Sequence, residues 1–149
     1  MSKSDAFENQ FLLHLFQNAA IANVGDGTGL DAAGTVGSLY IRLCDTSACT
    51  DATVGTELTY TGYVQYGVAV ARTSGGWTVA ANNATNTAAI TFGACTVGTV
   101  TVRFFEIWKT NVDATAANRL YWGQLTSDLA VSPGITPEFA ISALDVNED

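Results

Sequence analysis

The sequence predicts a mainly β protein: a single antiparallel β-sandwich or barrel-like domain of about seven strands, with one N-terminal amphipathic helix and a Gly-rich connector. Short segments rich in β-branched and aromatic residues recur after residue 37, and such side chains fit a pleated, half-buried surface. Turn-forming residues separate these segments, and no helical period lies between them. This pattern favours antiparallel sheets over βαβ units.

The helix is predicted over residues 5–22. Asp5 can cap it, and Glu8 follows three residues later, as in a capping box. Apolar side chains recur on one face at helical spacing, namely Phe7, Phe11, Leu12, Leu15, Phe16 and Ala19. We expect this face to pack against the domain itself or against a neighbouring subunit.

Residues 25–37, GDGTGLDAAGTVG, are predicted to be a flexible connector. Five of these thirteen residues are glycine, which favours neither helix nor strand. The chain is therefore divided into an N-terminal helix or arm (1–24), the connector (25–37) and a β domain (38–149).

Seven segments of the remaining chain have strand character, and turn residues such as Ser74-Gly75-Gly76 and Asn82-Asn83 separate them. They are residues 37–43, 62–72, 77–80, 88–92, 99–108, 120–125 and 137–146. The last is expected to place Phe139, Ile141 and Ala143 on one face, because successive strand side chains point to opposite faces.

Composition restricts the classes of partner. Apolar residues make up 48% of the chain and charged residues only 13%, so we expect order and association with another surface. The net charge of −8 disfavours nucleic acid, and nothing approaches the roughly 18–20 apolar residues of a membrane span. The N-terminus lacks a secretory layout, so we expect a soluble protein made in the host cytoplasm.

Three cysteines, Cys44, Cys49 and Cys95, do not complete a zinc site in this sequence. Cys44 and Cys49 end the segment CDTSAC and could form a disulfide if it folds back. A reducing compartment usually keeps such thiols free, so both states remain open.

Few residues suggest catalysis or metal binding, and we predict no catalytic, cofactor or metal site. His14 is expected to be a partly exposed helix residue. Asp26 and Asp31 are too few for an EF-hand. Glu106 interrupts the apolar strand RFFEIW, and we interpret it as an outward-facing or interface residue paired with Arg103 or an arginine of another strand.

The aromatic residues Trp77, Trp108, Tyr121 and Trp122 have two interpretations. Each lies in or beside a predicted strand, so packing in the core or at a subunit interface is favoured. The alternative is a carbohydrate-binding module, which requires exposed rings in one plane.

Five segments, in order GYVQYGVAVAR, GGWTV, NTAAITFG, GTVTVRFFEIW and RLYWGQLTSDLAVSPGITPEFAISAL, resemble a family of small tailed-bacteriophage virion proteins, labelled head decoration, cement or tail-fibre-like proteins. The resemblance covers nearly the whole chain. The Cys44–Cys49 segment and the aromatic strand end FFEIW depart from the family's pattern.

The resemblance implies a capsid decoration (cement) protein on the virion's outer head surface, which stabilises contacts between major capsid subunits. The implied partners are the major capsid protein and the chain itself, as a homotrimer. Candidate interface residues are Phe7, Phe11, Leu15, Phe16, Phe105, Glu106 and Trp108. A tail or baseplate component is the alternative within the same class.

Overall fold

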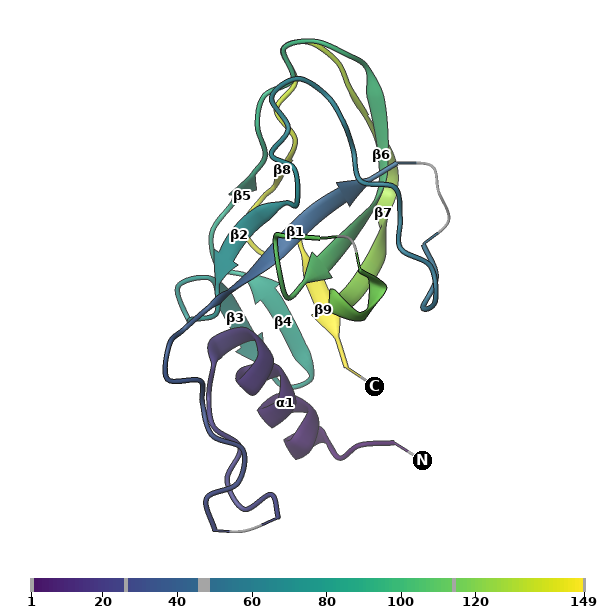
Figure 1. Cartoon of the computed structure of the whole chain (residues 1–149). Coiled ribbons are helices and arrows are strands. Elements are labelled where there is room, and N and C mark those ends of the chain that lie inside the picture. Colours follow the sequence, from purple (N-terminus) through teal and green to yellow (C-terminus); the bar gives the residue numbers. More distant parts are fainter. Residues whose placement is uncertain (1, 26, 46–48, 114, 149) are drawn as a thin grey trace. The chain divides into compact units, whose positions relative to one another are not determined.

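The computed structural model describes residues 2–25, 27–45, 49–113 and 115–148, and it confirms the mainly β prediction (Figure 1). The described residues form nine strands, one α-helix and a short 3-10 helix, with no closed barrel among them. They divide into two compact units. Unit 1 comprises residues 1–38, 70–90 and 139–149, and unit 2 comprises residues 39–69 and 91–138.

The helix of unit 1, α1 (Asp5–Gln17), is shorter than predicted. Asn18 ends it by adopting a left-handed conformation (φ 55°), from which its N–H donates to the carbonyl of Leu13. The predicted capping by Asp5 is also wrong, because Ser4 occupies the N-cap position and Asp5 is already helical. An asparagine tolerates the left-handed conformation well, and this allowed the chain to leave the helix five residues early.

The core of unit 1 lies between α1 and a three-stranded antiparallel sheet of β3 (Trp77–Ala80), β4 (Asn83–Asn86) and β9 (Asp145–Asn147). The Phe16 ring meets the Trp77 ring edge-on, with 4.6 Å between centroids, and both side chains are fully buried. The buried helix positions are Glu8, Leu12 and Phe16, so the face that packs is offset from the Phe7–Phe11–Leu15 row.

Beyond α1, hydrogen bonds join the two sides of what we call the arm, residues 18–25 and 27–37. Ile21 and Leu30 exchange two backbone hydrogen bonds of 2.8 Å each. The Asn18 side chain accepts from the Ala33 N–H (2.8 Å) and donates to the Ala33 carbonyl (3.0 Å). The predicted connector is therefore tied into a hairpin.

Gly29 is required at the closing point of the arm. Its φ is +72°, and a Cβ there would lie 2.0 Å from the Ile21 carbonyl oxygen. Only glycine allows the two sides of the arm to approach this closely.

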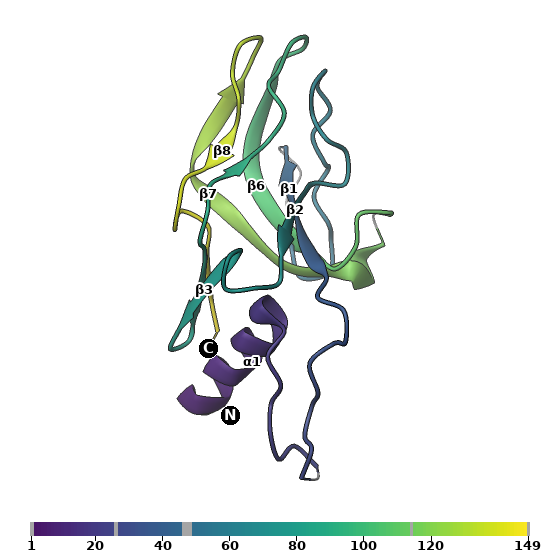
Figure 2. The ribbon, with the colours of Figure 1, turned by 90° about the vertical axis from the view of Figure 1, so that its left-hand side faces the viewer.

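Most residues of the four-stranded sheet lie in unit 2. Its order is β2 (Val68–Ala71), β1 (Ser38–Cys44), β6 (Val100–Trp108) and β7 (Arg119–Val131). Strand β1 pairs antiparallel with β6, and β6 pairs antiparallel with β7, which runs beside it in both views (Figures 1 and 2).

The register between β6 and β7 shifts part-way along the pair. Val102 faces Leu129 but Phe104 faces Gln124, so Arg103 lies opposite a bulge of several β7 residues. Two short strands, β5 (Ile90–Thr91) and β8 (Glu138–Phe139), form a separate two-stranded sheet.

Three strand predictions differ from the structure. Residues 62–72 form a strand only over β2, because Tyr66 (φ 66°) and Gly67 (φ 89°) form a turn before it. Residues 137–146 are not one strand, because a turn with Ser142 at φ 60° separates β8 from β9 and leaves Ile141 66% exposed. Strand β4 was not predicted, since its sequence NATN has little intrinsic strand preference. Hydrogen bonds to β3 on one side and to β9 on the other make this segment a strand despite its low intrinsic preference.

Candidate functional site

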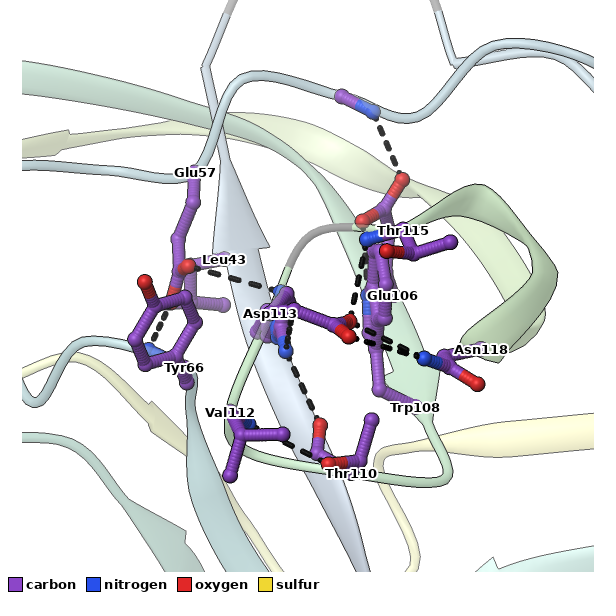
Figure 3. A network of polar contacts seen from close by, with 12 residues as sticks. Leu43, Glu57, Tyr66, Glu106, Trp108, Thr110, Val112, Asp113, Thr115 and Asn118 are labelled. Carbon is purple, nitrogen blue, oxygen red and sulfur yellow. Dashed lines mark hydrogen bonds and ion pairs between the residues drawn. The ribbon is translucent and has the colours of Figure 1, made fainter.

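Five side chains of unit 2 form a largely buried polar arrangement, which we call the charge network: Arg42, Glu57, Glu106, Trp108 and Arg119. Arg42 and Glu106 face each other across the β1–β6 pair, and Arg119 begins β7. Figure 3 shows Glu57, Glu106 and Trp108 among the surrounding loops.

Glu106 is the most fully bonded carboxylate of the charge network. One oxygen, Oε1, accepts from the Gly55 N–H (2.8 Å), from Arg119 Nη1 (2.9 Å) and from the Cys49 thiol (3.5 Å). The other, Oε2, accepts from the Trp108 indole N–H (2.9 Å). The side chain is 1% exposed.

The prediction for Glu106 is therefore half right. Its partner is an arginine of another strand, Arg119, whereas Arg103 pairs with Asp128 at 3.0 Å. The expectation that Glu106 faces outward or lies at an interface is wrong, because four donors from its own chain surround the carboxylate.

Arg119 uses the rest of its guanidinium to hold one loop. It donates to the carbonyls of Thr50, Asp51 (3.1 Å) and Thr53 (2.8 Å). A planar guanidinium offers five donors, so one side chain can satisfy several carbonyls and a carboxylate together. The loop that precedes Gly55 is thereby fixed to the start of β7.

Arg42 holds a second loop in the same way. Its Nη2 donates to the carbonyls of Thr110 (3.0 Å) and Asp113 (2.7 Å). Its guanidinium lies over the Trp108 ring, with 3.9 Å to the centroid, in a cation–π contact. Trp108 thus links the two arginines, since its ring faces Arg42 and its N–H binds the carboxylate that pairs with Arg119.

Glu57 partly neutralises Arg42. One carboxylate oxygen lies 3.8 Å from Arg42 Nη1, and the other accepts from the Tyr63 hydroxyl (3.0 Å) and the Tyr66 N–H (2.7 Å). Burial raises the pKa of Glu57, while Arg42 and the two tyrosine donors oppose the rise.

Asp113 shapes the loop that Arg42 binds. Its carboxylate accepts from the Asn118 amide and from the Thr115 N–H, as the dashed lines in Figure 3 show. These bonds hold the pKa of Asp113 below its usual value, the Asn118 bond contributing most. Both loops at this end of the sheet are therefore held by specific acceptors and donors.

The thiols of Cys44 and Cys49 lie beside Glu106, and one ligand atom from each of these three residues falls within 4.8 Å of the others. Both cysteines are free thiols in the structure, so a disulfide between them stays a prediction. Burial is the main cause that raises the pKa of Cys49 to about 11, and the negative charge of Glu106 is the next. The same two causes raise the pKa of Cys44 further. Three ligand atoms are fewer than the four of a structural zinc site, and the carboxylate is already paired with Arg119.

The charge network is suited to holding loops. A general acid or nucleophile must reach a substrate, whereas Glu106 is buried under its own donors and Glu57 is engaged by Arg42, Tyr63 and Tyr66. Most polar atoms of the network have partners, although Arg42 Nε is buried without a hydrogen bond, and paired buried polar groups make one arrangement of the chain preferred.

The candidate interface residues fall into two groups. Phe16, Glu106 and Trp108 are at most 1% exposed and pack inside the chain, so the prediction that they contact a partner is wrong. Phe7 is 38% exposed, while Phe11, Leu15 and Phe105 are half-buried. Phe105 lies over Gly123 of β7, where a Cβ would come within 2.6 Å of its ring.

Of the tryptophans, Trp77 and Trp108 are buried, which confirms the preference for core packing. An exposed platform of three tryptophans is therefore excluded. Trp122 is 37% exposed and donates to Asp51 at 3.1 Å. His14 is half-exposed on α1, as predicted, and its Nδ1 lies 2.7 Å from the Ala19 carbonyl. Asp26, considered for calcium, lies outside the described residues.

Unit 2 also contains an open groove of about 530 Å³ that was not predicted. It is lined by Leu58, Thr59, Tyr60, Thr61, Tyr63, Gln65, Val97 and Gly98. Its residues come from two separate segments, which the Thr61–Val97 bridge brings together. The sequence gives no periodic signal for such a pairing.

Comparison with known protein families identifies the chain. Residues 2–147 match the family model described as podophage GP4 fiber I protein gp80. The chain belongs to this family of phage virion structural proteins. The match covers both units, and it confirms the resemblance to tailed-phage virion proteins.

No curated protein matches the chain. Among the residues described, no helix has the length and apolar character needed to cross a bilayer.

Proposed function

We propose that this chain is a structural subunit of a phage fibre, and that it acts by assembly and not by catalysis. The family match over residues 2–147 carries the proposal, since the family description names a fibre protein. The charge network supports it, because its charged groups are engaged in holding loops of unit 2.

A fibre subunit must keep its surface loops in one arrangement while attached to other chains. Arg42 and Arg119 each bind backbone carbonyls of a separate loop, so both loops are anchored at buried charges. Such anchoring supports a protein whose contacts are made by preformed surfaces, because less ordering entropy is then lost on assembly.

The location in the virion is tested by labelling the protein in intact particles and counting its copies in electron cryo-microscopy maps. A few copies to a few dozen at the tail or neck are expected for a fibre. Hundreds of copies over the shell would instead support a capsid decoration protein bound to the major capsid protein, and would overturn the fibre proposal.

A further inference from the structure

Three side chains that can bind a metal converge in unit 2, beneath the loop that precedes Gly55. Cys44 ends β1, Cys49 lies in the loop and Glu106 belongs to β6, and one ligand atom from each falls within 4.8 Å of the others. All three residues are buried, at 0%, 4% and 1% exposure. Two sulfurs and a carboxylate oxygen are a donor set suited to Zn²⁺, which takes thiolate and carboxylate ligands.

The spacing of these ligand atoms matches a tetrahedral zinc ion. Cys49 Sγ lies 3.5 Å from Glu106 Oε1. Zinc bonds of about 2.3 Å to sulfur and about 2.0–2.2 Å to oxygen, at the tetrahedral angle, separate the two ligands by roughly 3.5–3.7 Å. Two thiolates on the same ion lie about 3.8 Å apart, which is compatible with the 4.8 Å within which all three atoms fall. The ligand atoms are thus close to the spacing that the ion requires.

Gly55 keeps a space open beside both sulfur atoms. A Cβ at this position would lie 2.6 Å from Cys49 Sγ and 3.0 Å from Cys44 Sγ, so a larger residue would fill the space. The Gly55 N–H donates to Glu106 Oε1 (2.8 Å), and the Trp108 indole N–H donates to Oε2 (2.9 Å). Hydrogen bonds of this kind orient a carboxylate that binds a metal.

We propose that Cys44, Cys49 and Glu106 bind one Zn²⁺ ion, and that a water molecule supplies the fourth ligand. Three protein ligands and one exchangeable ligand are an arrangement that zinc adopts in proteins. On binding, Zn²⁺ displaces the protons of the two thiols, which pass to the solvent. The two thiolates and the carboxylate then balance the charges of the ion and of the Arg119 guanidinium, so the buried cluster is neutral and Arg119 stays paired with Glu106.

The ion joins the end of β1 to the loop of residues 49–55, which Arg119 also holds. Residues 50–53 of this loop are exposed, so the ion has a path from solvent to the buried ligands. A metal that binds only the folded chain stabilises it by mass action. The inference goes beyond the proposed function, because the isolated chain binds the ion wherever the protein lies in the virion.

Metal binding is tested on the full chain, freed of metal with EDTA and kept reduced with a phosphine. Co²⁺ is the first probe, because it can replace Zn²⁺ in tetrahedral sites and its thiolate complexes absorb light strongly. We expect one equivalent of Co²⁺ to produce a thiolate charge-transfer band, and one equivalent of Zn²⁺ to remove it.

Cys44→Ser and Cys49→Ser each remove one thiolate. We expect each to weaken Zn²⁺ binding at least about 100-fold, since loss of a group that only supports a ligand costs roughly 10–100-fold. Gly55→Ala keeps every ligand but fills the space beside the sulfurs, and it should weaken binding at least about 10-fold. Cys95→Ser is the matched control and should bind like wild type, because this third buried cysteine lies outside the cluster and its Sγ faces backbone carbonyls.

Circular dichroism checks that each variant is folded, and X-ray absorption spectroscopy of the zinc-loaded wild type tests the site without any substitution. We expect a first shell of two sulfurs at about 2.3 Å and two lighter atoms at about 2.0–2.2 Å. Three results would overturn the inference: no cobalt band in wild type, a zinc shell without sulfur, or folded Cys44→Ser and Cys49→Ser variants that bind like wild type. The copy number in particles tests the proposed function separately, because it can exclude a fibre while zinc binding remains, and the reverse.

Discussion

The two units hold irregular segments to their sheets by different chemistry. In unit 1 a neutral side chain does so: Asn86, fully buried, donates to the carbonyls of Ala88 and Ala140 (2.8 Å each) and accepts from the Leu144 N–H (2.9 Å). In unit 2 the charged side chains of Arg42 and Arg119 hold the loops.

The difference lies in what each arrangement costs when it is incomplete. A neutral amide loses modest solvation on burial, whereas a buried charge is costly unless a counter-charge and further hydrogen bonds compensate it. Unit 2 should therefore be the more sensitive to loss of a single partner and to pH.

The largest effect is expected for Glu106→Gln. The substitution leaves Arg119 without its counter-charge, at 5% side-chain exposure, and places an amide NH₂ against N–H donors. Removing one partner of a buried ion pair costs about 3–5 kcal/mol. Urea unfolding should show this loss, and Arg119→Met should cost less in the Glu106→Gln background than in wild type.

The exposed pair Arg103–Asp128 lies in the same sheet and is a matched control for Glu106→Gln, with side chains 42% and 49% exposed. Asp128→Asn should change the free energy of unfolding by only about 0–1 kcal/mol. Equal losses for the two substitutions would contradict the importance given to burial.

The next largest effect is expected for Asn86→Ala, which leaves the Ala140 carbonyl and the Leu144 N–H without the Asn86 side chain. An unsatisfied buried group costs about 1–3 kcal/mol. Asn86→Asp should be worse than Asn86→Ala, because a carboxylate would face two carbonyl oxygens. Amide hydrogen exchange should become faster first in residues 139–147. Faster exchange confined to unit 2 would contradict the role of Asn86 in holding this segment.

A smaller effect is expected for Gly29→Ala, which tests how firmly the arm of unit 1 is closed. The left-handed conformation costs a non-glycine residue about 1–2 kcal/mol, and the new methyl would meet the Ile21 carbonyl. Faster exchange of the Ile21 and Leu30 amides is the measurement. Gly34→Ala is the control, since no atom lies within 4 Å of its Cβ position.

The smallest effect is a pH dependence of unit 2 that arises from Glu57. Its pKa is raised above the ordinary value of about 4.3, so the folded chain binds this proton more tightly than the unfolded chain. The contribution of Glu57 to stability therefore falls as pH rises through this range. The stability of wild type relative to Glu57→Gln should decrease from pH 4 towards pH 7, and an increase would contradict the raised pKa.

The predicted strands and the helix depend on local patterns, and most of them are present. Residues 99–108 are rich in β-branched and aromatic residues, and β6 lies within them. The prediction of one strand over residues 137–146 was wrong, because alternation among small residues does not distinguish a strand from a turn at Ser142. Strand β4 was missed because its asparagines carry no strand signal.

For the charge network, the sequence singled out two members, Glu106 and Trp108, and misjudged their surroundings. Glu106 was unusual in an apolar strand, and Trp108 shares its strand face two residues on. The Glu106 partners Gly55 and Arg119 lie 51 and 13 residues away, and no local pattern connects them to it. Arg42 gave no signal, since a single arginine in a strand is ordinarily a surface residue.

The sequence by itself determined the mainly β class, the N-terminal helix and the resemblance to phage virion proteins, because periodicity, turn residues and family segments are properties of short stretches of chain. Only the tertiary structure decided which charges are buried, that the connector closes on Asn18 and Ile21, and that two segments form the groove. Burial and hydrogen-bond partners depend on residues far apart in the chain, and their free energies are defined only once those residues meet.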